Sequence, residues 1–298
     1  MTFYQTVHGK INVIEFLSQK PSSYTILCIH GSPSDARVFT YVGKTLSQAG
    51  YNVASMDLPG HGGSDGPRGD LDFAKCLQAI NQIVSELKKK SKVIMMSHSM
   101  GSTVALWYAR SYKNRLDGLI VLCPYIRIKN IKRSDVEPSA STFLYLLFGR
   151  IFTPRKTVSI TKLLPTYAKI SGEEFAEMAQ DPTVNLEYSF RYFVDVMAGR
   201  NSKVTELADI VDPVLLLHGK RDRNVFPQVS EEYIKLLRAP RKDLKIFDCN
   251  HWFFDAVAFR QDSQRYPEES RKEFISTIIE WIDSIGTQAV TDAKLTGK

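Results

Sequence analysis

The stretch Ser97-His98-Ser99-Met100-Gly101 decides how this chain folds. It follows an apolar run of strand type and precedes a run that is long enough for a helix. A serine between small residues at such a strand-to-helix turn is typical of a nucleophile elbow, in which a tight turn exposes the serine hydroxyl. Gly101 fits this pattern, whereas Ser97 stands where glycine is usual and brings a Cβ and a hydroxyl into a crowded place. The pattern makes Ser99 the candidate nucleophile.

Strand-like and helical runs alternate along most of the 298 residues, a length that allows one large α/β domain with a sizeable core. This alternation predicts a mainly parallel, twisted sheet flanked by helices, in which ligands lie outside the carboxyl ends of the strands. A hairpin is expected over 2–8 and 11–17, further strands at 24–30, 52–56, 92–96, 119–123, 213–218 and 244–248, and helices at 38–49, 73–87, 103–110, 229–238 and 268–285.

One segment, residues 125–208, breaks the alternation and contains no obvious strand. We interpret it as a mostly helical cap, inserted between the core segments 1–124 and 209–286, over the active edge of the sheet. The aromatic and aliphatic side chains of the cap either pack it onto the core or line an apolar pocket. The final residues, 287–298, are small and polar, and we expect a flexible tail there. The candidate substrate-binding residues are Phe143 and Leu147 in the cap and Trp252 in the core.

The basic residues do not form a pattern typical of nucleic-acid binding. The formal charge is +7 and the isoelectric point about 9.1, but the charges are dispersed and no reading module accompanies them, so no nucleic-acid partner is expected. A basic surface can still attract acidic substrates or anionic membranes. A basic cluster at the start of the cap has two interpretations, a solvated face or an attracting surface, and consists of Arg127, Lys129, Lys132 and Arg133.

The four cysteines contain no Cys-x-x-Cys pair, and we expect no metal site built from them. Most of them lie in or just after strand-like runs, which suggests buried thiols and a reducing compartment. The N-terminus lacks the features of a signal peptide, and no apolar run reaches the roughly 18 residues that span a bilayer. These features predict a cytoplasmic protein that can touch a membrane surface but does not depend on it. They leave the oligomeric state open.

A serine hydroxyl becomes a good nucleophile when a base lies within hydrogen-bond reach and an acid orients that base. His251 is the best candidate base, because it follows the last strand and precedes the final helix. His98 directly precedes the serine, so its side chain should point away from that of Ser99. The histidines at strand ends that can instead bond loop carbonyls are His30, His61, His98 and His218.

Asp222 is the candidate acid, since it comes directly after a buried strand. It could alternatively form an Asx-turn or an ion pair with Arg221 or Arg223. Asp248 and Asp195 are the other candidates. With Asp222, the order along the chain is Ser, Asp, His, which is the order of α/β-hydrolase triads.

The oxyanion that forms during acyl transfer needs preorganised donors. We expect the backbone N–H of Met100, which follows the nucleophile, to be one of them. The second is expected to be the N–H of Ser32, in the turn His30-Gly31-Ser32-Pro33. This chemistry requires neither a metal nor a cofactor.

With these residues in place, the chain resembles the α/β-hydrolase-fold serine hydrolases. Within that superfamily, the loop at 60–69 and the position of the cap resemble the monoacylglycerol lipase and lysophospholipase group. The resemblance implies a small-molecule substrate, a carboxylic ester with an apolar acyl chain, which Ser99 cleaves through an acyl-enzyme. The matching segments are His30-Gly31-Ser32-Pro33, Asp57-Leu58-Pro59-Gly60-His61-Gly62-Gly63-Ser64, Ser97-His98-Ser99-Met100-Gly101, His218-Gly219-Lys220-Arg221-Asp222 and Asn250-His251.

Two other functions stay open on this fold. A peptidase of the proline iminopeptidase type is similar in fold and capped, although its usual Gly-Gly-Ser-Trp-Gly elbow is absent here. A ligand sensor that keeps the triad but turns over very slowly would have the same motifs. A dehalogenase is disfavoured, because the elbow carries serine rather than aspartate.

Overall fold

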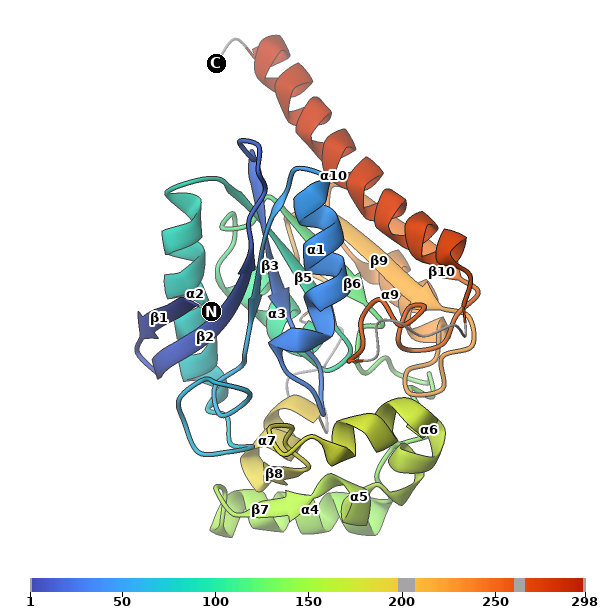
Figure 1. Ribbon diagram of the computed structural model, residues 1–298. Helices are drawn as coiled ribbons and strands as arrows, with labels where there is room; N and C mark the ends of the chain where they lie inside the picture. Colours follow the sequence, from blue (N-terminus) through green and yellow to red (C-terminus); the bar gives the residue numbers. More distant parts are fainter. Residues whose placement is uncertain (1, 198–206, 260–265, 297–298) are drawn as a thin grey trace.

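The computed structural model describes residues 2–197, 207–259 and 266–296, with only the backbone described at 174 and 287–296. Its core is an eight-stranded sheet with the order β1-β2-β4-β3-β5-β6-β9-β10 (Figure 1). The pairs β1–β2 and β2–β4 are antiparallel and the other neighbours are parallel, which confirms the predicted sheet and hairpin. The strands are β1 (Thr2–Thr6), β2 (Gly9–Phe16), β3 (Tyr24–Ile29), β4 (Asn52–Met56), β5 (Lys92–His98), β6 (Gly118–Leu122), β9 (Val214–Gly219) and β10 (Lys242–Phe247).

Helices cover both faces of this sheet. α1 and α10 contact each other on one face, and α2 and α3 contact each other on the other (Figure 1). The central strands are buried along their whole length, as expected for parallel strands between two helical layers. The core helices are η1 (Ala36–Phe39), α1 (Thr40–Gln48), α2 (Phe73–Lys88), α3 (Gly101–Ser111), α9 (Gln228–Leu236) and α10 (Glu268–Thr296).

The end of the chain differs from the prediction. α10 continues to Thr296, whereas we expected a helix to 285 and a flexible tail over 287–298. Residues 287–296 contain neither proline nor glycine and include two alanines and a lysine, which are good helix formers. Their small, polar composition therefore did not signal the end of the helix.

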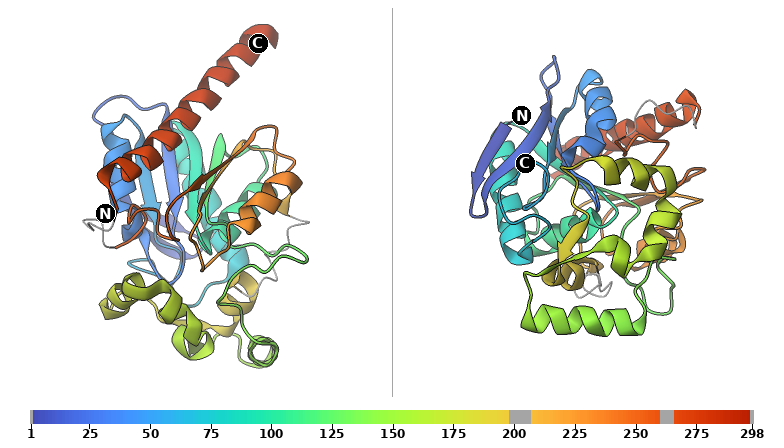
Figure 2. Two further views of the ribbon diagram at one scale, coloured as in Figure 1. Left: turned by 90° about the vertical axis from the view of Figure 1, so that its right-hand side faces the viewer. Right: turned by 60° about the horizontal axis from the view of Figure 1, so that its bottom comes forward.

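The cap lies against the end of the sheet where the parallel strands terminate, as the two further views in Figure 2 show. It is mostly helical, but it also contains an antiparallel pair, β7 with β8. The expectation that this segment contains no strand was wrong, because three-residue strands are too short to give a recognisable alternation. The cap elements are α4 (Ala140–Phe152), β7 (Thr157–Ser159), α5 (Ile160–Leu163), α6 (Pro165–Gln180), β8 (Glu187–Ser189), α7 (Phe190–Tyr192) and the turn η2 (Phe193–Met197).

The glycine-rich loop after β4 holds the cap to the core. Arg191 of α7 donates to both carboxylate oxygens of Asp70 at 2.6 Å, and Ser189 N–H donates to the carbonyl of Gly69 at 3.0 Å. Gly69 has a positive φ of 68°, and a Cβ there would lie 1.9 Å from the carbonyl oxygen of Glu187. The approach of the two backbones therefore requires glycine at this position.

Asp212, just before β9, provides a test of the packing at the base of the sheet. Burial raises its pKa to about 7, and its Oδ2 has no hydrogen-bond partner. Between about pH 4 and pH 7 the unfolded chain releases this proton while the folded chain keeps it, so stability falls as the pH rises through this window. Asp212→Asn should therefore raise the free energy of unfolding at pH 8 by on the order of 3 kcal/mol and change it little at pH 4.

Urea unfolding at both pH values measures this difference. Asp209→Asn serves as the control, because Asp209 forms an exposed ion pair with Lys113 and such pairs contribute little at either pH. An equal gain for Asp212→Asn at the two pH values would contradict the assignment of the effect to this carboxyl.

Candidate active site

The turn at Ser99 has the geometry that the elbow pattern predicts. Ser99 lies between β5 and α3 and has a φ of 53°, in the left-handed region that few non-glycine residues adopt. Its N–H donates to the carbonyl of Leu122 at 2.8 Å, which fixes the turn against β6. A Cβ at Gly101 would lie 2.3 Å from the carbonyl oxygen of His30, so this position needs glycine. Ser97 is accommodated at the first position of the turn, where it is fully buried and its hydroxyl has no hydrogen-bond partner.

The candidate acid and base contact each other directly. Asp222 follows β9 and His251 follows β10, and the Nδ1–H of His251 donates to Asp222 Oδ2 at 2.6 Å. The other carboxylate oxygen accepts from Val225 N–H, three residues on, at 2.8 Å, so Asp222 bonds its own loop and contacts His251 at the same time. Both side chains are at least nine-tenths buried. The orienting bond at Nδ1 leaves Nε2 of His251 as the nitrogen that can take a proton.

The other candidate acids lie elsewhere. Asp248 is 73% exposed and pairs with Arg221, while Asp195 pairs with Arg150 inside the cap. Arg223 pairs with Asp135 rather than with Asp222. The ion-pair alternatives for Asp222 are therefore not formed.

Asp222 is held in its charged form. Burial raises the pKa of its carboxyl, but the adjacent His251 and His218 rings lower it by more, so the pKa lies well below the usual range. A carboxylate that stays ionised can both fix the imidazole tautomer and stabilise the imidazolium that forms during catalysis.

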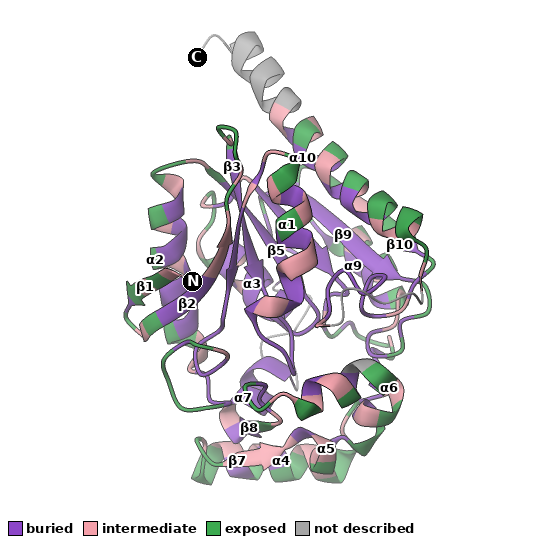
Figure 3. Cartoon of the chain, in the orientation of Figure 1, coloured by how far each residue is buried: buried purple, intermediate pink, exposed green. Residues whose placement is uncertain are grey.

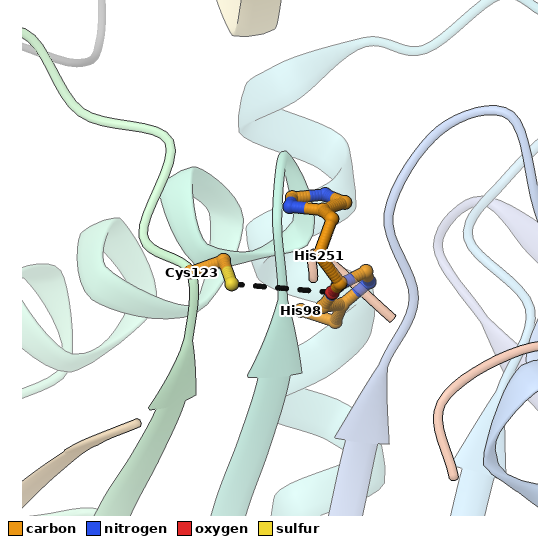
Figure 4. A group of neighbouring side chains, drawn as sticks. All are labelled: His98, Cys123 and His251. Carbon is orange, nitrogen blue, oxygen red and sulfur yellow. Dashed lines mark hydrogen bonds between the residues drawn. The ribbon is translucent and has the colours of Figure 1, made fainter. Parts of the chain in front are cut away.

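His98 is buried beside the base, a contact that the sequence did not reveal. Its Nε2–H donates to the backbone carbonyl of His251 at 2.9 Å, and the thiol of Cys123 lies 4.0 Å from the same oxygen (Figure 4). Burial and the neighbouring His251 lower the pKa of His98 to about 3, so the ring is neutral. The backbone of the base is therefore attached to the strands β5 and β6.

The remaining strand-end histidines also bond loop carbonyls, which was the structural interpretation of them. His30 bonds the carbonyl of Gly31 at 2.7 Å, His61 that of Pro59 at 3.0 Å, and His218 that of Val225 at 2.9 Å.

Ser99 is brought to the same edge of the sheet as Asp222 and His251, and the His98 ring lies 4.6 Å from the His251 ring, centroid to centroid. In the part of the chain that the structure describes, no hydrogen bond joins Ser99 Oγ to the His251 imidazole. Nucleophile–base bonds are often long in the absence of substrate and shorten when it binds. The structure therefore shows the contact between Asp222 and His251 at the same sheet edge as Ser99, and the bond to Ser99 belongs to the proposal below.

The two expected oxyanion donors are near the nucleophile and unused. A Cβ on Gly31, the neighbour of Ser32, would lie 3.1 Å from Ser99 Cβ, so the Ser32 turn approaches the elbow closely. Met100 precedes α3. Among the described residues, the backbone N–H groups of Ser32 and Met100 have no protein acceptor. Both are thus available to a ligand oxygen.

Comparison with known proteins decides the family. The family model described as Hydrolase_4, serine aminopeptidase S33, matches residues 20–251, which is most of the chain. The chain belongs to this family. The predicted resemblance to α/β hydrolases is confirmed, and this S33 member is a hydrolase.

Relatives of this S33 hydrolase include proteins with different names. A monoglyceride lipase homolog of monkeypox virus is 25% identical over 272 residues, 88% of this chain and 91% of the relative. A proline iminopeptidase of Saccharolobus solfataricus is 30% identical over 306 residues, 95% of this chain and 92% of the relative. Membership of the S33 family therefore leaves open whether the substrate is an ester or a peptide.

Solved structures of monoacylglycerol lipases share the fold of the S33 chain. The enzyme from Paleococcus ferrophilus superposes with a TM-score of 0.73 at 25% identity, over 96% of this chain and all of the other. A soluble variant of the monoglyceride lipase from Saccharomyces cerevisiae has a TM-score of 0.76 at 22% identity, over 95% of this chain and 94% of the other. The second likeness shows the fold alone.

A small cavity of the S33 chain borders His251, the candidate base. A polar cavity of about 70 Å³ borders His251 and Trp252 and is otherwise lined by Ile170, Ser171, Arg221, Arg223, Asn224 and Asn250. A larger cavity of about 270 Å³ lies at the β2 and β4 side, next to Asn12 and Asp57. We assign the site to the smaller space, because the candidate base borders it.

The three candidate substrate-binding residues lie in different places. The Trp252 ring packs against the His98 and His251 rings at 5.3 and 5.4 Å. Phe143 and Leu147 are half-buried on α4, a helix that packs mainly against α7 and η2. Trp252 is thus beside the base, whereas the roles of Phe143 and Leu147 stay predictions.

Two side-chain groups in the site have donor atoms within 4.8 Å of one another, as a metal ion requires: His98, Cys123 and His251, and Cys123, His218 and Asp222. Several of these atoms already form the hydrogen bonds described above, although His98 Nδ1 has no partner. Burial raises the pKa of the Cys123 thiol well above its usual range. A cation would need the thiolate, and in the second group it would compete with His251 for Asp222. These residues do not fit a resident metal, and the expectation of a metal-free site stays a prediction.

Proposed function

We propose that this S33 hydrolase cleaves carboxylic esters with apolar acyl chains through Ser99, His251 and Asp222. The observation that carries the proposal is the 2.6 Å contact between Asp222 and His251 next to a serine held at a positive φ. A Ser-His-Asp triad needs each of these parts. No cofactor is required for the reaction.

The proposed reaction has two halves. Ser99 Oγ attacks the ester carbonyl while Nε2 of His251 takes its proton, and the N–H groups of Ser32 and Met100 donate to the oxyanion. His251 then gives the proton to the leaving alcohol, and an acyl-enzyme remains. Water, activated by His251, releases the acid and restores Ser99.

The volume of the cavity beside His251 limits the size of the substrate that it can bind. About 70 Å³ is below the several hundred Å³ of a usual ligand pocket. The cavity that borders His251 therefore does not by itself accommodate a long acyl chain.

A proline iminopeptidase activity is the second candidate, because a relative with that name is 30% identical. Such a substrate presents a cationic amino terminus, for which a carboxylate near the base is the natural partner. Among the described residues, the lining of the cavity at His251 includes Arg221 and Arg223 and no carboxylate. This lining favours an uncharged ester over an amino-terminal peptide. A slow ligand sensor differs from both in its turnover alone.

A substrate series tests these alternatives. We expect turnover of p-nitrophenyl and monoacylglycerol esters, with a rate that depends on acyl length, and negligible cleavage of proline anilides. Fast anilide turnover without ester turnover would establish the peptidase instead. Tight binding with turnover slower than about one per hour, against about 10 per second for a median enzyme, would establish a sensor.

If Phe143 and Leu147 line the acyl path, Phe143→Ser or Leu147→Ser should shift the preferred acyl length of p-nitrophenyl esters, because each removes apolar surface worth about 1–3 kcal/mol in a pocket. kcat/KM across the chain-length series is the measurement. Leu236→Ser is the control, since Leu236 is an exposed leucine on α9, outside the cap. A profile that all three variants leave unchanged would assign Phe143 and Leu147 to cap packing.

The outer face of α4 supports contact with a membrane. Five large side chains on this helix are 50–71% exposed, whereas the central strands of the sheet are buried (Figure 3). Exposed Arg155 and Lys156 follow the helix directly. We propose that this face, flanked by positive charge, lies on the surface of an anionic bilayer. The residues of the face are Leu144, Tyr145, Phe148, Ile151 and Phe152. Among the described residues, no helix combines the length and apolar character needed to cross a membrane.

Co-sedimentation with vesicles measures this contact. Binding is expected to be stronger to phosphatidylglycerol-containing vesicles than to phosphatidylcholine alone and to weaken as salt rises. Phe148→Ser with Ile151→Ser should abolish it, while Leu236→Ser, at an exposed site on α9, should not. Equal binding by both variants would place the contact elsewhere.

A further inference from the structure

A cap tyrosine joins the two residues that carry the proposed oxyanion donors. The hydroxyl of Tyr192, in α7, lies 2.5 Å from Ser32 Oγ and donates to Met100 Sδ at 3.4 Å. The thioether sulfur of Met100 can only accept, whereas either hydroxyl can donate in the contact between Tyr192 and Ser32. A continuous chain of hydrogen bonds thus runs from Ser32 through Tyr192 to Met100, and all three residues are buried.

A second tyrosine of the cap holds the same turn. Tyr167, in α6, donates to the backbone carbonyl of Ser32 at 3.1 Å. The side chain and the carbonyl of Ser32 are therefore both bonded to the cap, while its N–H stays free for a ligand. The cap contacts the turn at its polar atoms rather than through apolar packing alone.

The position of the Tyr192 ring is fixed from several sides. It stacks on Tyr188 at 4.6 Å with an interplanar angle of 22°, and it lies 5.6 Å from the ring of His61. Burial and the neighbouring His30 lower the pKa of His61 to about 3, so this ring packs as a neutral group. Arg191, the preceding residue, forms the buried ion pair with Asp70. The Gly60–Gly69 loop, which the proposed reaction does not use, thereby supports Tyr192.

We propose that Tyr192 is a positioning residue that sets the spacing of the Ser32 and Met100 N–H donors. The oxyanion site is then complete when the cap is packed on the core. This inference rests on the proposed function, because it gives Ser32 and Met100 the role of donors. Oxyanion donors act within a narrow range of about 2.7–3.1 Å. Ser32 lies in a loop and Met100 precedes a helix, so a shared partner fixes one relative to the other.

The test is Tyr192→Phe, which keeps the ring and removes the hydroxyl. We expect kcat on a p-nitrophenyl ester to fall about tenfold with KM nearly unchanged, because the donors act on the transition state and not on the ground state. The affinity for an alkyl boronic acid, which forms a tetrahedral adduct on the serine, should fall by the same factor. If Tyr192 had a merely structural role, Tyr192→Phe would change the melting temperature but would not lower kcat while leaving KM unchanged.

Tyr188→Phe is the matched control. Tyr188 stacks on the same ring and lies near Ser32, but its hydroxyl makes no hydrogen bond of normal geometry. This variant should keep kcat and the boronic acid affinity of the unaltered chain. A loss equal to that of Tyr192→Phe would overturn the proposal, since it would make the effect one of packing.

Ser32→Ala approaches the same link from its other end and keeps the backbone donor. In a double-mutant cycle, the variant with both changes should lose no more activity than either single variant. Losses that multiply would mean that the two hydroxyls act separately, which would overturn the proposal even if Tyr192→Phe were poorly folded.

Labelling of the unaltered protein with a fluorophosphonate separates this test from that of the function. Failure of Ser99 to react would count against the triad itself. A labelled Ser99 together with a fully active Tyr192→Phe variant would reject the positioning role and leave the triad in place.

Discussion

Replacing Ser99 with alanine is expected to abolish ester turnover, with a loss of kcat of up to about a million-fold by analogy with a serine protease triad. The reason is that no acyl-enzyme can form without its Oγ. Ser99 makes no side-chain hydrogen bond in the described chain, so the variant should keep its fold. Initial rates on p-nitrophenyl esters and the melting temperature measure the two effects.

Ser97→Gly provides the matched control for this prediction. It restores the small residue that is usual at this position of the elbow and removes a buried hydroxyl that has no partner. We expect it to remain active and to be labelled by a fluorophosphonate, in contrast to Ser99→Ala. Retained turnover in Ser99→Ala would remove Ser99 from the mechanism.

Asp222→Asn should lower kcat by up to about ten-thousand-fold, as the corresponding change does in a serine protease triad. An amide can donate to Nδ1 of His251, which would place the imidazole hydrogen on Nε2, where the base must accept a proton from Ser99. The buried carboxylate also faces His218 at 3.4 Å, and its loss removes the charge that stabilises the imidazolium. The measurement is kcat at a pH near neutrality, with circular dichroism as the check on folding.

Asp248→Asn is the control for the acid. Asp248 lies in the same part of the sheet edge, but it is exposed and pairs with Arg221, so its change should leave kcat within about twofold, as expected for a surface pair. If Asp248→Asn rather than Asp222→Asn caused the severe loss, the assignment of the acid would be wrong.

The part of the molecule that sequence reasoning recovered is the part with a strong local signal. Runs such as 24–30 and 119–123 are apolar throughout, because strands buried between two helical layers have no solvent face. The positions of Asp222 and His251 at one edge of the sheet could be predicted, since each directly follows a strand and parallel strands end at one edge. Their contact then follows from β9 and β10 being neighbours. Their catalytic roles stay predictions.

The parts that sequence reasoning missed depend on contacts between distant segments. Tyr192 and Tyr167 lie in a region without periodicity, and their partner Ser32 is 160 and 135 residues away. The bond from His98 to the carbonyl of His251 likewise spans 153 residues. A pattern within one segment cannot reveal such pairs, although the histidine beside Ser99 was one local signal of a buried polar partner.

The close approach at Gly69 restricts how this molecule can change over evolution. The cap backbone lies so close to Gly69 that any side chain at this position would clash with it and push the cap away from the core. Packing of the cap thus depends on this particular loop. A cap transplanted from a relative without the matching loop would not pack correctly on the core. We therefore expect substitutions in the cap to be tolerated better away from this junction than at it.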